Sequence, residues 1–329
     1  MNTAKIQAGM LFAALAIASQ VHSAELQLPK DGWVSWQVEA VEDSPAMCCW
    51  SSWDNGVASD AVCKLDGDKQ GYGSRDKTKT DLVRVYARLA GGKVEKVRAL
   101  AAACPVETKS PIQKLDNIAT DDSARWLLGL AKAAREEINE ETLAALAVHR
   151  GAVALDGLGT MARTDAQEET RKRAIFWLAM LRGTAGADIT TNAMFNDQSA
   201  EVRKHSAFAI TQSKSPRVTA DLTKLGNTDR DADVRAQAWF WLAHTGAAKV
   251  EDAIIAASKM DQDDHVREQT IFSLSQLPDE RATPALIKAA EDRTLSHEQR
   301  KRALFWLAQS ESPGAQAYLD KVLAGNRTN

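Results

Sequence analysis

The sequence predicts a mainly helical fold, in which a stack of short helix pairs follows a small β-rich domain held by disulfides. The nine-residue phrase Arg171 to Ala179 returns almost unchanged as Arg300 to Ala308. A fixed period of this size is typical of stacked repeats whose units cannot each bury an apolar face alone. All four cysteines lie in the first third of the chain. Arginines recur every 32 or 33 residues, at Arg171, Arg203, Arg235, Arg267 and Arg300.

The first 24 residues are typical of a secretory signal. Lys5 provides a positive start, residues 8–18 an apolar core and Val21 to Ala24 a cleavage region with small residues. The apolar core is too short to span a membrane comfortably. We therefore expect the signal to be removed, no membrane insertion afterwards, and an exported protein that is periplasmic or secreted.

Composition narrows the classes of partner. The 329 residues are 44% hydrophobic and 26% charged, which is ordinary for a soluble globular protein. Loss of Lys5 with the signal changes the formal charge from -3 to -4. Nucleic acid is therefore a disfavoured partner, because phosphate binding needs a basic face.

Residues 25–119 lack the 32-residue period and are predicted to form a β-rich domain. Trp33 to Val38 alternates large apolar and polar groups, as a strand does. Leu82 to Leu89 and Val94 to Leu100 are β-rich runs joined across Gly91 and Gly92, which predicts a hairpin. The polar segment from Asp66 to Asp81 is predicted to be a surface loop.

The cysteines are predicted to form structural disulfides, which export makes available. A bond between neighbouring cysteines would be strained, because their Cα atoms lie only about 3.8 Å apart. Each of the adjacent pair is therefore expected to bond to a distant cysteine, with the pairing open. A metal site is the competing interpretation, but the Cys-x-x-Cys spacing is missing. The four residues are Cys48, Cys49, Cys63 and Cys104.

Four tryptophans also crowd into this domain, at Trp33, Trp36, Trp50 and Trp53. They could form a stacking platform for a sugar or a peptide. We favour the alternative that they cover the disulfides, because a domain of this size buries little other core.

From Thr120 to the C-terminus the pattern is helical. A first helix is expected through Trp126 and Leu130, and a second begins near Asn139. Five helix pairs follow, and in most of them an acidic loop residue precedes the repeat arginine by six positions. The second helix then begins with a Val-Arg pair, as at Val202. A last amphipathic helix carries Tyr318 and is expected to close the stack.

The Asp-x5-Arg spacing, the Val-Arg start and the helix pairs resemble HEAT repeats, specifically the short HEAT-like repeats of the phycobilisome-lyase type. The resemblance covers about residues 151–312, with 120–150 as a degenerate repeat, and extends to exported bacterial proteins with a cysteine-containing N-terminal domain. It implies hydrogen-bonded ladders between loop aspartates and helix arginines. Thr294 departs from the motif in the fifth repeat. The implied ladder residues are Asp165, Asp197, Asp229, Asp261, Arg171, Arg203, Arg235, Arg267 and Arg300.

Helical geometry predicts that one phenylalanine per repeat faces away from the core. With Val234 at zero, Ala238, Trp241 and Leu242 fall at about 40°, 340° and 80°, and Phe240 at about 240°. Trp177, Trp241 and Trp306 are accordingly expected in the core. The same outward register holds for Phe176, Phe208, Phe240, Phe272 and Phe305.

In a solenoid whose second helices line the concave surface, these rings would form the floor of a groove. The alternative is that the solenoid curls tightly and the rings pack together as ordinary core. Contiguous apolar stripes with polar rims are typical of binding grooves. The expected rim consists of Arg173, Gln212, His244, Gln276, Arg302 and Gln309.

The sequence contains none of the common catalytic motifs, such as His-Glu-x-x-His or a glycine-rich phosphate loop. We therefore expect a non-enzymatic scaffold without a cofactor or metal, binding an extended peptide or protein partner. The alternative is a lyase-like or chaperone-like protein that holds a hydrophobic small molecule in the groove. A third hypothesis is a rigid spacer, with the tryptophan cluster of the N-terminal domain as the working surface.

Overall fold

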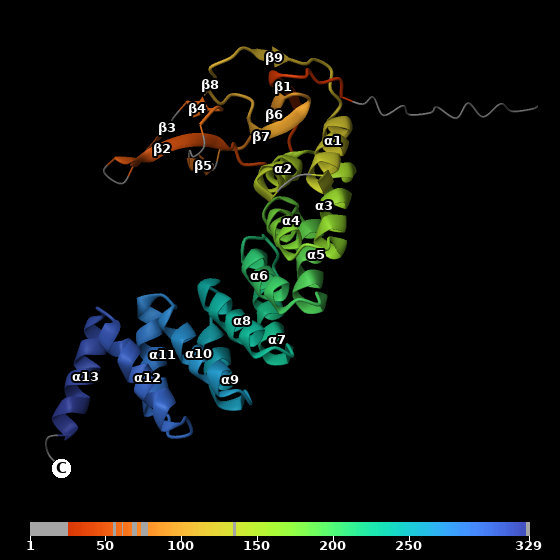
Figure 1. The fold of residues 1–329 in the computed structure, drawn as a ribbon. Coiled ribbons are helices and arrows are strands. Elements are labelled where there is room, and N and C mark those ends of the chain that lie inside the picture. The colour runs from red at the N-terminus through yellow and green to blue at the C-terminus, as the bar shows by residue number, and fades with distance from the viewer. Residues whose placement is uncertain are drawn as a thin grey trace, which may run out of the picture.

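The computed structural model describes residues 26–54, 57–60, 62–67, 71–73, 78–133 and 136–326. The predicted signal, residues 1–24, lies outside this part of the chain. A β-rich region comes first and a long stack of helices follows (Figure 1). The strands are β1 (Gly32–Glu39), β2 (Cys48–Asp54), β3 (Val57–Asp60), β4 (Cys63–Lys64), β5 (Gly71–Gly73), β6 (Leu82–Ala90), β7 (Lys93–Ala101), β8 (Val106–Glu107) and β9 (Ile112–Lys114).

The main sheet has the strand order β7-β6-β1-β9. Strand β1 pairs antiparallel with β6 and parallel with β9, and β6 pairs antiparallel with β7. The predicted first strand and hairpin are thus confirmed. Gly91 and Gly92 both have positive φ angles, 55° and 74°, which is why glycine occupies this turn.

The segment predicted to be a surface loop contains a strand instead. Residues Gly71–Gly73 form β5, which pairs antiparallel with β2, and β3 lies on the other side of β2. The prediction is wrong for these three residues, because two glycines flank Tyr72 and hide the strand signal. This strand forms because its backbone pairs with β2, and side-chain propensity does not reveal such pairing.

The two faces of β1 contact different cores. Trp33 packs in a cluster with Tyr86, Leu100 and the disulfide cysteines. Trp36 points to the opposite face, where its ring meets Trp126 of the first helix edge to face at 5.3 Å. The expected cover of the disulfides is therefore confirmed for Trp33 but wrong for Trp36. The side chains of Trp50 and Trp53 lie outside the described part.

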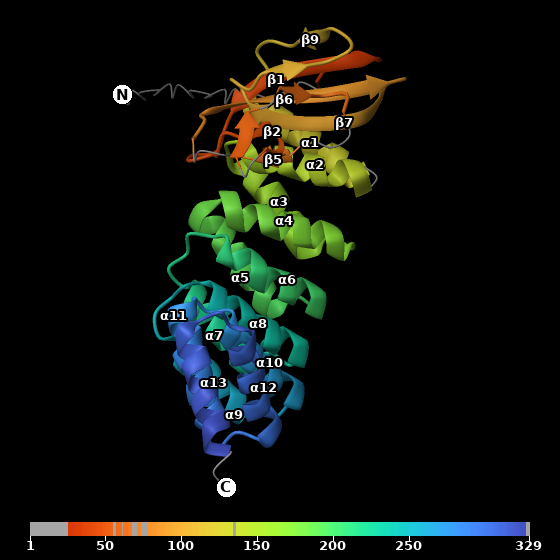
Figure 2. The same cartoon turned by 90° about the vertical axis from the view of Figure 1, so that its left-hand side faces the viewer.

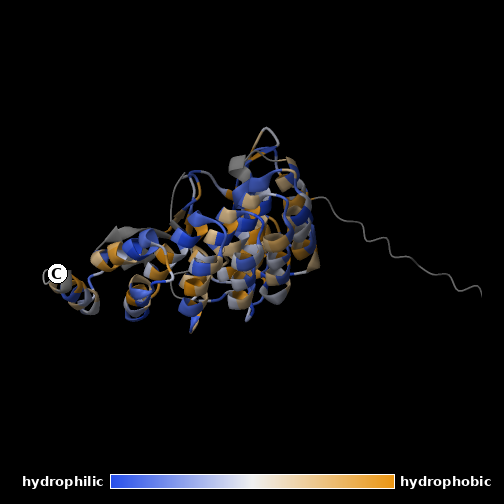
Figure 3. Ribbon diagram, turned by 90° about the horizontal axis from the view of Figure 1, so that it is seen from below, coloured by the Kyte–Doolittle hydropathy of each residue, from blue (hydrophilic) through white to orange (hydrophobic). Residues whose placement is uncertain are grey.

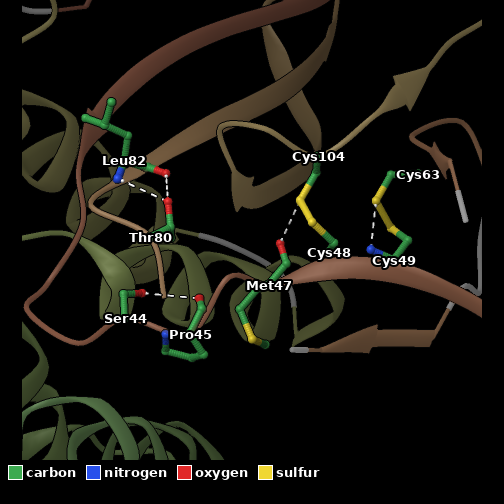
Figure 4. Close-up of a disulfide and its surroundings, with 9 residues drawn as sticks. All are labelled: Ser44, Pro45, Met47, Cys48, Cys49, Cys63, Thr80, Leu82 and Cys104. Carbon is green, nitrogen blue, oxygen red and sulfur yellow. Dashed lines mark hydrogen bonds between the residues drawn. A yellow bond between two sulfur atoms is a disulfide. The ribbon is translucent and has the colours of Figure 1, made fainter. Parts of the chain in front are cut away.

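Two disulfides connect this region, Cys48–Cys104 and Cys49–Cys63 (Figure 4). They confirm that each of the adjacent cysteines bonds to a distant partner. The carbonyl oxygen of Met47 lies 3.3 Å from Sγ of Cys104. The bonds join β2 to the loop after β7 and to β4, so they fix the smaller strands beside the main sheet.

Thirteen helices follow in the described part, and they comprise five helix pairs between two leading helices and one closing helix. The second helix begins at Glu136, three residues before the predicted start. The helices are α1 (Thr120–Ala133), α2 (Glu136–Val148), α3 (Ala152–Thr164), α4 (Glu168–Leu181), α5 (Gly183–Asn196), α6 (Ala200–Thr211), α7 (Val218–Thr228), α8 (Ala232–His244), α9 (Val250–Met260), α10 (Asp264–Ser275), α11 (Asp279–Glu291), α12 (His297–Gln309) and α13 (Pro313–Asn326).

The sheet covers the first end of the helical stack, where β7 packs on α2 (Figure 2). One hydrophobic core contains both Val34 and Trp36 of β1 and Leu127, Leu143 and other residues of the leading helices. The backbone N–H of Val41 donates to the carbonyl of Val148 at 2.8 Å. Because this core is continuous, a domain division at residue 119 stays a prediction.

The helices form an arc with two layers. In Figure 1, the even-numbered helices α2 to α10 lie on the inner side of the arc and the odd-numbered helices α1 to α9 on the outer side. Successive second helices pack more closely on one another than successive first helices do, as an inner layer must. Apolar and polar residues alternate around the helices, as expected of amphipathic repeats (Figure 3).

Candidate binding surface on the inner helices

Buried ion pairs join neighbouring repeats. The guanidinium of Arg203 donates to both carboxylate oxygens of Asp229, and its third nitrogen donates to the carbonyl of Asp197 at 2.9 Å. Bidentate bonds of this kind fix direction as well as distance. We name the set the Asp–Arg ladder; its Nε–Oδ2 distances are 2.9 Å for Arg171–Asp197, 2.8 Å for Arg203–Asp229 and 2.8 Å for Arg235–Asp261.

The ladder ends on both sides of these three pairs. Oδ1 of Asp165 accepts from the backbone N–H of Gln167 rather than from an arginine of another repeat. Arg267 donates to the carbonyl of Asp261 and pairs with Asp264 in its own repeat. Arg300 donates to the carbonyl of Leu295. The resemblance thus placed Asp165 and Arg300 in a ladder that the structure does not extend to them, and Thr294 supplies no carboxylate for Arg267.

The phenylalanines lie at the surface of the inner helices and contact one another. Phe176, Phe208, Phe240 and Phe272 are half-buried, and Phe305 is 53% exposed. The rings of Phe176 and Phe208 stack with centroids 6.0 Å apart, and those of Phe240 and Phe272 stack at 5.8 Å. They are therefore neither sealed between helix layers nor isolated in water.

Three tryptophans, which were predicted to be core, pack partly against it and also contact these rings. Trp241 lies 4.8 Å from Phe208 and 5.0 Å from Phe240, and Trp306 lies 5.0 Å from Phe272. All three tryptophans are half-buried. We call the combined surface the aromatic strip; it consists of Phe176, Trp177, Phe208, Phe240, Trp241, Phe272, Phe305 and Trp306.

Trp239 is the buried tryptophan of α8 and sequence reasoning did not find it. Only 1% of its surface is exposed, and its ring packs over Gly226 of α7. A Cβ atom on Gly226 would lie 2.5 Å from the indole. The glycine in the facing helix is therefore the sequence signal that could have identified it.

Two hollows interrupt the aromatic strip. A hollow of about 470 Å³ lies between α8 and α10, with Phe240 and Phe272 beside Gln237 and Gln269. A smaller one of about 200 Å³ borders Phe176 and Trp177, together with His205. Burial lowers the pKa of His205, and the positive charge of Lys172 lowers it further, so this imidazole is neutral at pH 7.

The predicted polar rim is partly engaged within the protein. The ring of His244 lies 4.4 Å from that of Phe240, and Arg302 forms an ion pair with Glu268 at 2.8 Å. Arg173 borders the smaller hollow. The amides of Gln212 and Gln276 donate to the hydroxyls of their preceding residues, at 3.0 and 3.1 Å, and Gln309 is exposed.

No helix in the described ranges has both the length and the apolar character needed to cross a membrane. Among the acidic residues before α10, Asp261 pairs with Arg235 and Asp263 caps the helix. The candidate site therefore consists of the aromatic strip, its hollows and its rim.

Comparison with known proteins bears on the helical part. A family model of HEAT repeats matches residues 155–239 and 227–308. No curated protein matches the sequence. Two solved structures show similarity to this chain. Human deoxyhypusine hydroxylase is 15% identical with a TM-score of 0.30, and the match covers 61% of this chain and 90% of that one. YibA of Escherichia coli is 19% identical with a TM-score of 0.37, and the match covers 62% of this chain and 76% of that one. The family match and the observed helix pairs together support a HEAT-repeat protein.

Proposed function

We propose that this protein is an exported, non-enzymatic scaffold that binds an extended peptide or protein segment along the aromatic strip. HEAT repeats suggest a solenoid scaffold for protein interaction. The single observation that carries the proposal is the continuity of half-exposed aromatic rings over five successive inner helices. Aromatic side chains concentrate binding energy at protein interfaces because they bury large areas at low entropic cost.

The strip has the dimensions of an extended segment. Packed helices lie about 8–10 Å apart, so the second helices α4 and α12 are roughly 30–40 Å apart along the strip. An extended chain covers at most about 3.3–3.6 Å per residue. A segment of about ten residues therefore matches the strip, and apolar side chains at intervals along it would meet successive rings.

Residues of both charge signs border the two hollows of the strip. Beside the larger hollow, Lys204 and His265 lie near Asp233, and His265 Nε2 is 3.5 Å from that carboxylate. Beside the smaller hollow, Lys172 pairs with Glu169. Because positive and negative side chains lie beside each hollow, we expect apolar contacts, rather than the net charge of the partner, to determine which segment binds.

A hydrophobic small molecule is the second candidate. The hollow between Phe240 and Phe272, at about 470 Å³, lies within the usual range for small-molecule sites. A lyase-like or chaperone-like role would use this hollow alone. Changes at Phe272 would then abolish binding, whereas changes at Phe176 would have no effect.

Export is supported by the two disulfides, which persist in oxidising compartments. Their presence is consistent with a periplasmic or extracellular location. A fusion of residues 1–30 to a reporter that is active only outside the cytoplasm would test the signal. Activity of the fusion would support export, and a reporter confined to the cytoplasm would contradict it.

The proposal can be tested by selecting ligands from a library of random decapeptides. Selected sequences should carry aromatic or aliphatic residues and should compete with one another for a single site. Crosslinks from a selected peptide should reach α4, α8 and α12 in one complex. Selection of no peptide, or crosslinks confined to the outer helices, would contradict the proposal.

A further inference from the structure

A third cavity lies where the N-terminal region meets the beginning of the solenoid. Its volume is about 740 Å³. One wall comes from residues 41–43, Pro45 and Lys79, and the other from Leu155, the end of α4 and the beginning of α5. Lys214, in the loop after α6, also borders it. We call this cavity the junction pocket.

The junction pocket contains a buried cation with few partners. Arg182 is only 8% exposed, and its Nη2 donates to the carbonyl of Leu146 at 3.1 Å. Its Nε is buried and has no hydrogen-bond partner. Among the residues that the structure describes, no carboxylate lies within ion-pairing distance of this guanidinium. The ladder arginines, which are buried to a similar degree, each have an aspartate.

The backbone holds Arg182 firmly in this position. It is the single residue between α4 and α5, and Gly183 follows it with a φ of 52°. A Cβ atom on Gly186 would lie 1.9 Å from the carbonyl of Leu178 and 2.6 Å from Cβ of Arg182. Because glycine permits this close approach, the first turn of α5 packs tightly against the base of the Arg182 side chain.

An unpaired buried charge is unfavourable, so this arrangement needs a reason. Burial lowers the pKa of Arg182 to about 10, which still leaves the side chain charged at neutral pH. An anion entering the pocket would supply the missing counter-charge and accept hydrogen bonds from the guanidinium. Such charge-assisted bonds are the strongest that a neutral-pH site can offer.

The rest of the pocket determines what kind of anion fits. Leu155, Met180 and Leu181 provide an apolar wall. At the opening, Lys79 forms an ion pair with Asp43, and Lys214 lies 3.7 Å from the same carboxylate. Glu42 adds a second negative charge to the opening. Because a single buried cation lies beside an apolar wall, a single carboxylate on an apolar body matches the pocket better than a compact polyanion does.

We propose that the junction pocket binds a carboxylate carried on an apolar body, with the carboxylate on Arg182 and the apolar part against Leu155, Met180 and Leu181. The volume lies in the range of small-molecule sites. Two sources share this chemistry: a medium-chain fatty acid and the free C-terminus of an apolar peptide. The site is separate from the aromatic strip and does not depend on the function proposed for it.

Calorimetric titration of the full mature protein can test the proposal with four probes. Decanoate is compared with decanol, and N-acetyl-dileucine is compared with its C-terminal amide. At least one acid should bind with one-to-one stoichiometry and at least about tenfold more tightly than its neutral counterpart, because the neutral form lacks the charge-assisted bond. Preference for decanoate identifies the fatty acid, and preference for the dipeptide identifies a C-terminus. Failure of both acids, or equal binding of acid and neutral probes, would overturn the proposal.

Variants at the pocket locate the binding. Arg182→Met should weaken binding of the preferred acid by at least about tenfold, and it should fold because an apolar replacement removes the unpaired charge. Arg230→Met, at an exposed arginine of a more distant loop, is the matched control and should leave binding unchanged. If Arg182→Met fails to fold, Met180→Glu keeps Arg182 and places a competing carboxylate in the wall. Unchanged acid binding in a folded Arg182→Met or Met180→Glu variant would overturn the assignment.

Discussion

Arg203 and Asp229 form a buried bidentate ion pair across two repeats. Nε lies 2.8 Å from Oδ2 and Nη2 lies 2.9 Å from Oδ1, and the two side chains are 2% and 5% exposed. Because Arg203 belongs to α6 and Asp229 follows α7, the pair fixes the position of one repeat against the next. The orientation of the inner helices, and with it the continuity of the aromatic strip, depends on such pairs.

Removing either residue of this ion pair should therefore lower the unfolding free energy markedly. Asp229→Ala leaves the guanidinium of Arg203 buried without its carboxylate, which typically costs about 3–5 kcal/mol of unfolding free energy. Chemical denaturation followed by circular dichroism measures the change. Asp165→Ala is the matched control, because Asp165 holds the same place in the first repeat but its carboxylate accepts, among the described residues, from a backbone N–H and not from an arginine. Equal losses in the two variants would show that the ladder contributes nothing specific.

Trp239 and Gly226 provide a second test of packing. Gly226→Ala would place a Cβ atom 2.5 Å from a rigid indole ring, so overpacking should lower the unfolding free energy by about 1–3 kcal/mol. Gly129→Ala, in α1, meets no atom within 4 Å and should be neutral or stabilise by up to about 1 kcal/mol. Thermal denaturation distinguishes the two. A stable Gly226→Ala protein would mean that α7 and α8 do not pack as described.

His149 connects the sheet to the solenoid through a chain of buried hydrogen bonds. Nε1 of Trp36 donates to Oγ of Ser123 at 2.7 Å, and that hydroxyl lies 2.8 Å from Nε2 of His149. Nδ1 of the histidine lies 2.6 Å from the carbonyl of Ala145. All these hydrogen bonds form when Nδ1 of His149 carries the proton and donates to the carbonyl of Ala145, while Nε2 accepts from the hydroxyl of Ser123. Burial, together with the nearby charge of Arg182, lowers the pKa of His149 to about 4.

Stability should consequently fall in mild acid. The folded-state pKa lies below the ordinary value of 6.5, so the unfolded chain binds the proton first, and this contribution is lost as pH falls from 6.5 towards 4. Between pH 7 and pH 5 the expected loss is about 2 kcal/mol. The unfolding free energy, measured by denaturation at pH 7 and at pH 5, should differ less between the two pH values in His149→Asn than in the parent protein. An equal pH dependence in the two proteins would contradict the assignment.

The period, the motif and the cysteine spacing were enough to predict the helix pairs and the separate bonding of Cys48 and Cys49. The angular argument was only partly right for the tryptophans, which pack against the core but stay half-buried, and α8 shows why. Its buried residues extend from Val234 and Ala238 through Trp239 to Ala243, a sector of roughly 200° centred near 100° rather than near zero. A solenoid helix packs against its own partner and against both neighbours, so its buried face is wider than that of an isolated amphipathic helix.

The N-terminal region was harder to predict for a different reason. Strand β5 is held by backbone pairing with β2, which side-chain pattern does not reveal. Trp36 packs on a helix more than 80 residues later in the chain, and its role depends on which face of β1 meets the solenoid. Arg182 is likewise unpaired because, among the described residues, no carboxylate lies close to its guanidinium. A repeat motif cannot indicate this.

The most direct test of the central claim is the dissociation constant of a selected decapeptide for Phe208→Ser with Phe240→Ser, compared with the parent protein. Phe195→Ser is the matched control, because this half-buried ring lies on the outer helix α5, with Nζ of Lys224 4.7 Å from its centroid. If the aromatic strip is the binding surface, the double variant should bind at least about tenfold more weakly, as expected of aromatic interface residues, and stay folded while the control binds normally. Unchanged affinity in the double variant, or collapse of its thermal midpoint because the rings are core, would contradict the claim.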